Sequence, residues 1–277
     1  EEALGMAAES DIIVAAVGEN VMLCGENRDR QGLRLPGRQE QYVEELLATG
    51  KPVVLVVFGG RAQVISGIAE RCAAVIQAWY PGEEGGNAVA DILYGNVSPS
   101  AKLSVSYPNV ELYEPLCYNT SVEKDPRVQW PFGYGLSYTT FEYSDLQLDA
   151  KASTSDKYVN LTFNVKNTGS VVADEVAQVY LSPTTDGQNI RPIQLQGFAR
   201  VSLEPGQTRT VSVKLHTEQF GYYTNDGVRQ WNIAPGTFEV KIGASSADIR
   251  LYDKVTLTGK HVVKPLRDHY FSEVTVK

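Results

Sequence analysis

In the first half of the chain, short apolar runs alternate with segments of helical periodicity. The apolar runs are nearly continuous and span residues 12–17, 52–58 and 74–79. Strands of a parallel sheet have this pattern when helices cover both faces of the sheet. The helical segments span residues 39–49, 62–72 and 87–94, and Gly67 interrupts the second of them. This alternating order predicts a doubly wound α/β layer.

From about Phe141 the hydrophobic pattern changes to period two, which is the period of a half-buried strand. Strands are predicted at residues 159–165, 176–181, 210–215, 238–242 and 249–257. Turn sequences such as Glu204-Pro205-Gly206 separate them. Many short strands at this spacing predict a β-sandwich of the immunoglobulin or fibronectin type III style. The last stretch, 261–277, is predicted to be an extended tail outside the sandwich core.

The length of 277 residues suggests two domains, at roughly 100–200 residues per domain. Their predicted limits are 1–125 for an α/β domain that lacks its N-terminal part, 126–140 for a linker, 141–260 for the sandwich and 261–277 for the C-terminal tail. Apolar residues make up 43% of the chain and charged residues 21%, which is sufficient for packed cores. The chain has no initiator methionine and starts with a helix-like stretch, so we expect it to be the later part of a longer polypeptide.

Charge and composition exclude several functions. The net charge of −8 gives no general attraction to nucleic acid or to an anionic membrane surface, and no apolar stretch is long enough for a membrane-spanning helix. The three cysteines are too scattered for a disulfide scaffold or a cysteine-rich zinc site; they are Cys24, Cys72 and Cys117. The histidines have no metal-ligand spacing, and a structural or surface role is expected for them; they are His216, His261 and His269. The sequence therefore predicts neither a metal site nor a cofactor.

The loops that follow the predicted parallel strands are the candidate positions for chemistry, because ligands of open α/β sheets bind beyond the carboxyl ends of the strands. The first loop, Gly18–Arg38, is longer than about 12–15 residues, and loops of that length are usually functional or disordered. Two further loops, Gly59–Arg61 and Pro81–Asn87, are predicted to reach the same edge. Composition by itself favours a solvated surface role for Glu26 and ion pairing for the arginines of the first loop.

Several motifs resemble the C-terminal part of glycoside hydrolase family 3. In order along the chain they are Gly18-Glu19, Gly25-Glu26, Leu35-Pro36-Gly37, Gly50–Val56, Gly60-Arg61, Ala78–Asn87, Asp91–Gly95 and Pro131–Thr139. The resemblance runs through nearly the whole chain and is closest to the three-domain β-glucosidase branch. It implies an α/β sandwich domain followed by a fibronectin type III-like domain.

The resemblance also implies roles for individual residues. In that family a TIM barrel carries the aspartate nucleophile, and the α/β domain supplies a glutamate acid/base, which the resemblance places on Glu26. The competing carboxylate, Glu19, is expected to be structural, whereas Arg28 and Arg30 are expected to orient the loop or to contact the aglycone side of the substrate. Retaining hydrolysis needs two carboxyl groups about 5–5.5 Å apart. The barrel is absent from this chain, so the chain is predicted to be inactive by itself.

The predicted function is therefore that of the C-terminal portion of a retaining exo-acting β-glucosidase, with a β-linked gluco-oligosaccharide or glucoside as substrate. Its predicted partner is the N-terminal TIM-barrel portion, a homodimer is compatible with the resemblance, and the expected location is periplasmic or secreted. Three alternatives stay open: a β-xylosidase or other family 3 exo-glycosidase, an N-acetyl-β-hexosaminidase, and a non-catalytic carbohydrate-binding or scaffolding module. The family's hexosaminidases tend to use a histidine of a barrel loop as acid/base, so the Glu26 loop argues against that alternative.

Overall fold

The computed structural model describes residues 1–277 except 113, 115, 120–124, 156–157, 185–190 and 225–228. The chain forms two compact units. Unit 1 comprises 1–96, 106–116 and 125–130, and unit 2 comprises 97–105, 117–124 and 131–277. The predicted domain limits near residue 125 and residue 141 stay a prediction. Within the described ranges, no helix has both the length and the apolar character that crossing a membrane requires.

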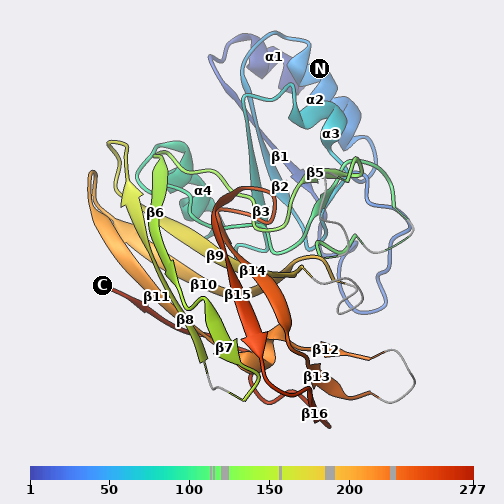
Figure 1. Ribbon diagram of the computed structural model, residues 1–277. Helices are drawn as coiled ribbons and strands as arrows, with labels where there is room; N and C mark the ends of the chain where they lie inside the picture. Colours follow the sequence, from blue (N-terminus) through green and yellow to red (C-terminus); the bar gives the residue numbers. More distant parts are fainter. Residues whose placement is uncertain (113, 115, 120–124, 156–157, 185–190, 225–228) are drawn as a thin grey trace. The chain divides into compact units, whose positions relative to one another are not determined.

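Unit 1 contains a small parallel sheet with helices between its strands (Figure 1). Its elements are α1 (Glu2–Ala8), β1 (Ile13–Gly18), α2 (Gln39–Leu47), β2 (Val53–Phe58), α3 (Ser66–Ala69), β3 (Ala74–Trp79), α4 (Gly85–Leu93), β4 (Tyr107–Pro108) and β5 (Val128–Trp130). The order β1-β2-β3 places the most apolar strand, β2, at the centre, where Leu55 and Val57 are fully buried. The predicted α/β architecture is confirmed.

The second predicted helix is much shorter than expected. The helical pattern of residues 62–72 yields only the four residues of α3. Val64 instead forms an isolated parallel bridge with Arg34, so the backbone before α3 is extended. Gly67, which lowers helix propensity, lies in the remaining short helix. The pairing of this segment with the long first loop therefore competes successfully with helix formation.

Unit 2 is a β-sandwich. Its elements are β6 (Phe141–Leu148), β7 (Lys151–Ser153), β8 (Tyr158–Asn167), β9 (Ala173–Pro183), β10 (Gln194–Leu203), β11 (Thr208–His216), the 3-10 helix η1 (Thr217–Phe220), β12 (Tyr222–Tyr223), β13 (Trp231–Ile233), β14 (Gly236–Gly243), β15 (Ile249–Thr258), β16 (Val262–Lys264) and β17 (Glu273–Val276). One sheet has the order β10-β9-β14-β15-β7, and the other has the order β17-β11-β8-β6. The predicted sandwich is confirmed.

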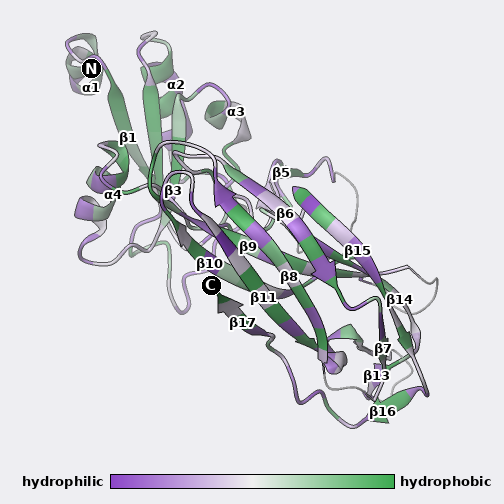
Figure 2. Ribbon diagram, turned by 60° about the vertical axis from the view of Figure 1, so that its left-hand side comes forward, coloured by the Kyte–Doolittle hydropathy of each residue, from purple (hydrophilic) through white to green (hydrophobic). Residues whose placement is uncertain are grey.

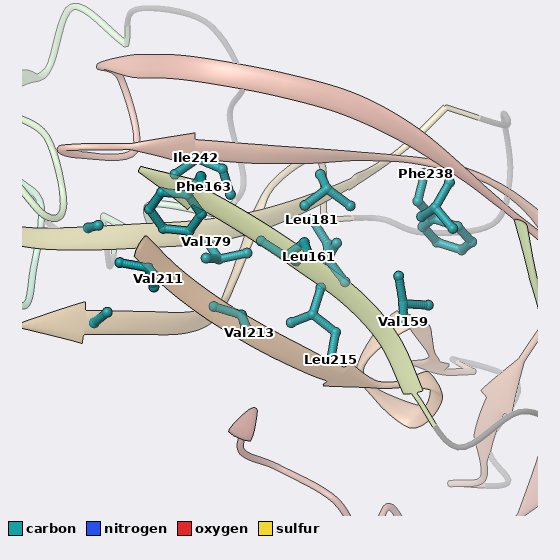
Figure 3. Close-up of a cluster of buried hydrophobic side chains, with 14 of the residues drawn as sticks. Val159, Leu161, Phe163, Val179, Leu181, Val211, Val213, Leu215, Phe238 and Ile242 are labelled. Carbon is teal, nitrogen blue, oxygen red and sulfur yellow. The ribbon is translucent and has the colours of Figure 1, made fainter. Parts of the chain in front are cut away.

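The sandwich core is formed by the alternating inward-facing residues of both sheets. Figure 2 shows this alternation of hydrophobic and hydrophilic residues along the sandwich strands, whereas β1 of unit 1 is almost uniformly hydrophobic. In Figure 3, Leu161 and Phe163 of β8 lie among side chains of β9, β11 and β14. Fully burying one such side chain stabilises the fold by about 1.5–3 kcal/mol, so this cluster is the main stabilising element of unit 2.

The C-terminal stretch does not lie outside the sandwich, as the sequence pattern predicted. β17 pairs antiparallel with β11 and forms an edge of the second sheet, and Val274 and Val276 pack against the core. β16 pairs with β13 in a separate small sheet. Only the segment between β16 and β17 is irregular. The prediction of a tail was wrong because β17 has four residues and pairs with a strand that is distant in sequence.

Candidate active site

The three parallel strands of unit 1 end at a common edge, where three loops leave the sheet. β1 ends at Gly18, β2 is followed by Gly59-Gly60-Arg61, and β3 is followed by Tyr80. The loop after β1 runs from Glu19 to Arg38 and contains no helix. We call it the acidic loop after its carboxylates Glu19 and Glu26, although it also contains four arginines. The carboxyl edge of such a sheet is where open α/β folds bind their ligands.

Gly18 lets the end of β1 approach the end of β2. Its φ is +129°, and a Cβ atom there would lie 1.8 Å from the carbonyl oxygen of Phe58. That oxygen accepts a hydrogen bond from the amide of Glu19 at 2.9 Å. On the other side, the Gln39 side chain of α2 accepts from the Gly18 amide at 2.7 Å and donates to the Gly18 carbonyl at 2.9 Å. These contacts fix Glu19 beside the end of β2.

Glu19 is the buried carboxylate of this edge, and its side chain is 0% exposed. Arg30 donates to its Oε1 at 2.6 Å, Arg61 donates to both carboxylate oxygens at 2.8 Å, and the Cys24 thiol donates to Oε2 at 2.9 Å. Burial opposes ionisation, but the hydrogen bonds from Cys24, Arg30 and Arg61 outweigh it and lower the pKa of Glu19. Glu19 is therefore ionised at neutral pH and has no proton to donate.

Arg61 connects this carboxylate to the acidic loop. Its guanidinium also donates to the carbonyl of Leu23 at 3.1 Å, to Sγ of Cys24 at 3.1 Å and to the carbonyl of Arg28 at 3.3 Å. The interaction with Glu19 raises the pKa of Arg61 against the opposing effect of its own burial. The rigid, planar fork of a guanidinium suits such a role, because one side chain can bind several acceptors.

Glu26 lies at the corner of a tight turn in the acidic loop. The amide of Arg28 donates to the carbonyl of Gly25 at 3.1 Å, which makes Glu26 and Asn27 the central residues of a four-residue turn. Gly25 has φ +134° and Asn27 has φ +58°. A positive φ at the third position is the pattern of a type II turn, and Asn tolerates it. The turn places Glu26 on the surface, where its carboxylate makes no hydrogen bond or ion pair with any residue that the structure describes.

The two arginines that flank Glu26 in sequence are held differently. Arg30 is largely buried and is occupied by Glu19 and by the carbonyl of Arg34. Arg28 is exposed, and its guanidinium donates to the carbonyl of Val21 within the same loop. Both arginines thus contact the acidic loop itself, and their contact with a substrate stays a prediction. Sequence reasoning missed the part that Arg61 plays, although its position after β2 placed it at the correct edge.

Two of the three histidines form a cluster that their spacing in the sequence did not reveal. In unit 2, the rings of His216 and His269 stack with centroids 3.6 Å apart and planes 10° apart, and Glu218 lies beside them. Imidazole nitrogens bind a metal in the plane of the ring at about 2.0–2.1 Å, so two parallel stacked rings cannot converge on one ion. Lys264 also forms an ion pair with Glu218. The cluster does not suit a metal ion and is structural.

Two domain families match the chain. The glycosyl hydrolase family 3 C-terminal domain matches residues 1–138, and the fibronectin type III-like domain matches residues 175–246. The chain belongs to glycoside hydrolase family 3. It contains the family's C-terminal domain, followed by the fibronectin type III-like domain.

Similar family 3 proteins include glucosidases and xylosidases. The chain is 35% identical over 269 residues to a periplasmic beta-glucosidase of Salmonella typhimurium, with 90% of this chain and 35% of that protein covered. It is 36% identical over 256 residues to a beta-xylosidase of Formosa agariphila, with 88% and 35% covered. The structure of a beta-glucosidase from Kluyveromyces marxianus in complex with glucose superposes with a TM-score of 0.83 at 33% identity, and covers 95% of this chain and 33% of that one. The chain thus spans about a third of the length of these family 3 relatives.

Proposed function

We propose that this chain is the C-terminal portion of a retaining exo-acting β-glucosidase and that Glu26 is its general acid/base. The observation that carries the proposal is the position of Glu26 in a family 3 chain. It is an exposed, unpaired carboxylate on a tight turn at the carboxyl edge of the parallel sheet. Glu19, the buried carboxylate at this edge, is ionised between two arginines, so it cannot serve as a proton donor.

The proposed reaction has two steps. In the first step the protonated Glu26 donates its proton to the glycosidic oxygen while an aspartate of the TIM barrel attacks the anomeric carbon, which releases the aglycone alcohol and leaves a glycosyl-enzyme. In the second step the Glu26 carboxylate removes a proton from water, which attacks the same carbon and frees the sugar and the aspartate. The barrel is a separate part of the proposed enzyme, so this chain is expected to be inactive without it.

Glucosides are the proposed substrates because glucosidases occur among the chain's relatives and the chain superposes on a beta-glucosidase bound to glucose. A β-xylosidase is the second candidate, since a relative of that name is equally similar. Arg28 and Arg30 are proposed to orient the acidic loop, and Arg28, the more exposed, to approach the aglycone side of the substrate. The homodimer and the periplasmic or secreted location remain predictions.

The test uses the full-length enzyme that contains this chain, with Glu26→Gln and, as a matched control, Glu44→Gln on the exposed side of α2. General acid catalysis contributes about 10²–10⁴-fold, so Glu26→Gln should lower kcat/KM, which reports the first step, by that factor for alkyl glucosides, whose leaving groups need a proton. The kcat/KM for activated nitrophenyl glucosides should fall much less. Glu44→Gln should match the parent enzyme on both substrates.

Three results would count against the proposal. Equal losses on alkyl and nitrophenyl glucosides would remove the proton-donor role of Glu26. The full-length protein could also bind carbohydrate but hydrolyse no nitrophenyl glycoside. That result would favour a non-catalytic module. A higher kcat/KM for nitrophenyl xyloside than for nitrophenyl glucoside would favour the β-xylosidase.

A further inference from the structure

The acidic loop has little regular structure to define its shape. Between Glu19 and Arg30 the described backbone hydrogen bonds within the loop are those from Leu23 to Asn20 and from Arg28 to Gly25. A loop with so few backbone bonds samples other conformations unless its side chains fix it. Whatever fixes this loop also sets the direction in which Glu26 points.

Side-chain bonds to Glu19 provide that constraint. Two of its partners, Cys24 and Arg30, belong to the loop itself and lie on either side of Glu26 in sequence. The third partner, Arg61, comes from the loop after β2 and so ties Glu19 to the neighbouring strand of the sheet. The single carboxylate of Glu19 is thus the common acceptor for both flanks of the turn that carries Glu26.

Arg61 reinforces the same two flanks. It donates to the carbonyl of Leu23, which precedes the turn, and to the carbonyl of Arg28, the last residue of the turn. The Gly59-Gly60 pair before Arg61 leaves no room for side chains at these positions. A Cβ atom on Gly60 would lie 2.7 Å from the ring of Tyr80, and Gly59 has φ +141°.

We infer that Glu19 is a positioning residue for catalysis: paired with Arg61, its carboxylate holds the turn so that Glu26 points at the glycosidic oxygen. The inference rests on the proposed role of Glu26. It goes beyond a structural role for Glu19, because it assigns the orientation of the proton donor to this one ion-paired network. Loss of the negative charge would leave the sheet in place and release the turn.

Glu19→Gln is the informative change, because glutamine has almost the same size but carries no charge for Arg30 and Arg61. A misplacement of about 1 Å at a catalytic group can cost about 10²-fold, so we expect kcat/KM of the full-length enzyme for alkyl glucosides to fall by about 10–100-fold, through a lower kcat and not through a higher KM. The loss in kcat/KM should be smaller for nitrophenyl glucosides, since the group that is displaced is the proton donor of the first step. Glu19→Asp, which keeps the charge, should restore part of the activity.

The matched control is Glu40→Gln. Glu40 also pairs with an arginine of the acidic loop, Arg34, but this pair lies beyond the turn and near α2. Its loss should leave kcat unchanged for both kinds of substrate. Because Glu40→Gln also removes a carboxylate that pairs with an arginine of this loop, it separates the positioning of Glu26 from a general effect of losing an ion pair in unit 1.

Alkylation of Cys24 by iodoacetamide reports the same network independently of activity. In the parent enzyme the thiol is half-buried and bonded to Glu19 and Arg61. Glu19→Gln should increase its alkylation rate by about 10-fold, in proportion to the open population of the loop. The exposed Cys117 provides the internal reference by peptide mass spectrometry, and Glu40→Gln should leave both rates unchanged.

Glu26→Gln is measured in parallel to separate this inference from the proposed function. If Glu26→Gln does not lose more activity on alkyl glucosides than on nitrophenyl glucosides, the proposed function fails and the inference fails with it. If Glu26→Gln loses more on alkyl glucosides but Glu19→Gln keeps the parent kcat/KM, or loses equally on both substrates, the positioning role is wrong and the proposed function stands. If Glu19→Gln does not fold, Arg61→Lys decides by the same criteria, because it keeps a positive charge but loses the guanidinium bonds to Leu23 and Arg28.

Discussion

Glu19 in unit 1 and Glu218 in unit 2 are both buried and both ion-paired. They differ in the segment that each one holds in place. Glu19 binds Arg30 and Arg61 and fixes a loop that immediately follows it. Glu218 accepts from Lys264 and from the backbone amides of Asp268 and His269, about fifty residues later, and fixes the C-terminal segment. The presence of a buried, ion-paired carboxylate therefore does not by itself indicate a functional site.

The pKa values of the two glutamates show why neither is a proton donor. Burial opposes ionisation of Glu218, but Lys264 and the two backbone amides lower the pKa of Glu218 to about 2. The pKa of Glu19 is also lowered, by Cys24 and the two arginines against the effect of burial. Both side chains are anions at neutral pH. The comparison directs the search for an acid/base to an exposed carboxylate, and our proposal assigns it to Glu26, whose turn the Glu19 network contacts on both flanks.

The largest stability effect is expected from removing the Glu218 carboxylate. Glu218→Ala leaves Lys264 with only its exposed partner Asp268 among the described residues, and it leaves the amides of Asp268 and His269 without their acceptor. Breaking a buried pair in this way costs about 3 kcal/mol. The measurement is hydrogen exchange of β11 and β17, with the exposed turn residue Glu204→Ala as control. Equal protection from hydrogen exchange in the two variants would mean that Glu218 does not stabilise the C-terminal segment.

The same network predicts a pH dependence with a definite sign. Because the folded-state pKa of Glu218 is depressed from 4.5 to about 2, its charge stabilises unit 2 fully above about pH 4.5, and this contribution is lost as the pH falls toward 2. The difference in unfolding free energy between the parent chain and Glu218→Gln should shrink over that interval. A difference that stays constant between pH 5 and pH 2.5 would contradict the assignment.

A smaller effect is expected in the Glu19 network when only its thiol is removed. Cys24→Ala deletes one weak donor while Glu19 keeps both guanidinium partners, so unit 1 should lose about 1 kcal/mol or less. Hydrogen exchange of β1 and β2 measures this loss, and Cys117→Ala at the surface serves as the control. A loss much above that value would make the thiol, rather than the arginines, the main partner of Glu19.

No effect is expected from divalent metal ions at the cluster beside Glu218. The stacked rings of His216 and His269 cannot bind one ion together, and Lys264 competes for the carboxylate. Neither addition of Zn²⁺ nor addition of EDTA should change the melting temperature of unit 2. A rise in melting temperature that His269→Ala abolishes would show that the rings rearrange to bind metal.

The sequence predicted the elements whose pattern is local. The continuous apolar run of β2 and the clean alternation of β8 both predicted the observed strands. The prediction failed where pairing is long-range or irregular. β10 contains a register shift at Gly197, β6 contains one beside Asp145 with φ +55°, and β17 is too short to recognise without its partner β11.

The candidate site was predicted in outline but not in its connections. The length of the loop after β1 and the family resemblance both directed attention to Glu26, and the position of Glu19 at the strand end suggested a structural carboxylate. The sequence does not indicate which cations reach Glu19, because Arg61 lies on a different loop and meets it only through the pairing of β1 with β2. The stacking of His216 on His269 could not be predicted either, because the two residues are far apart in the sequence and meet only in the folded chain.

The most direct test is the pH dependence of kcat/KM for an alkyl glucoside, measured on the full-length enzyme and on Glu26→Gln and Glu19→Gln. If Glu26 donates the proton, the decline in rate at high pH reports the loss of that proton. Glu26→Gln should then lose this decline, and Glu19→Gln should keep it at a lower overall rate. A Glu26→Gln enzyme that still shows the high-pH decline of the parent would contradict the assignment of Glu26 as the acid/base.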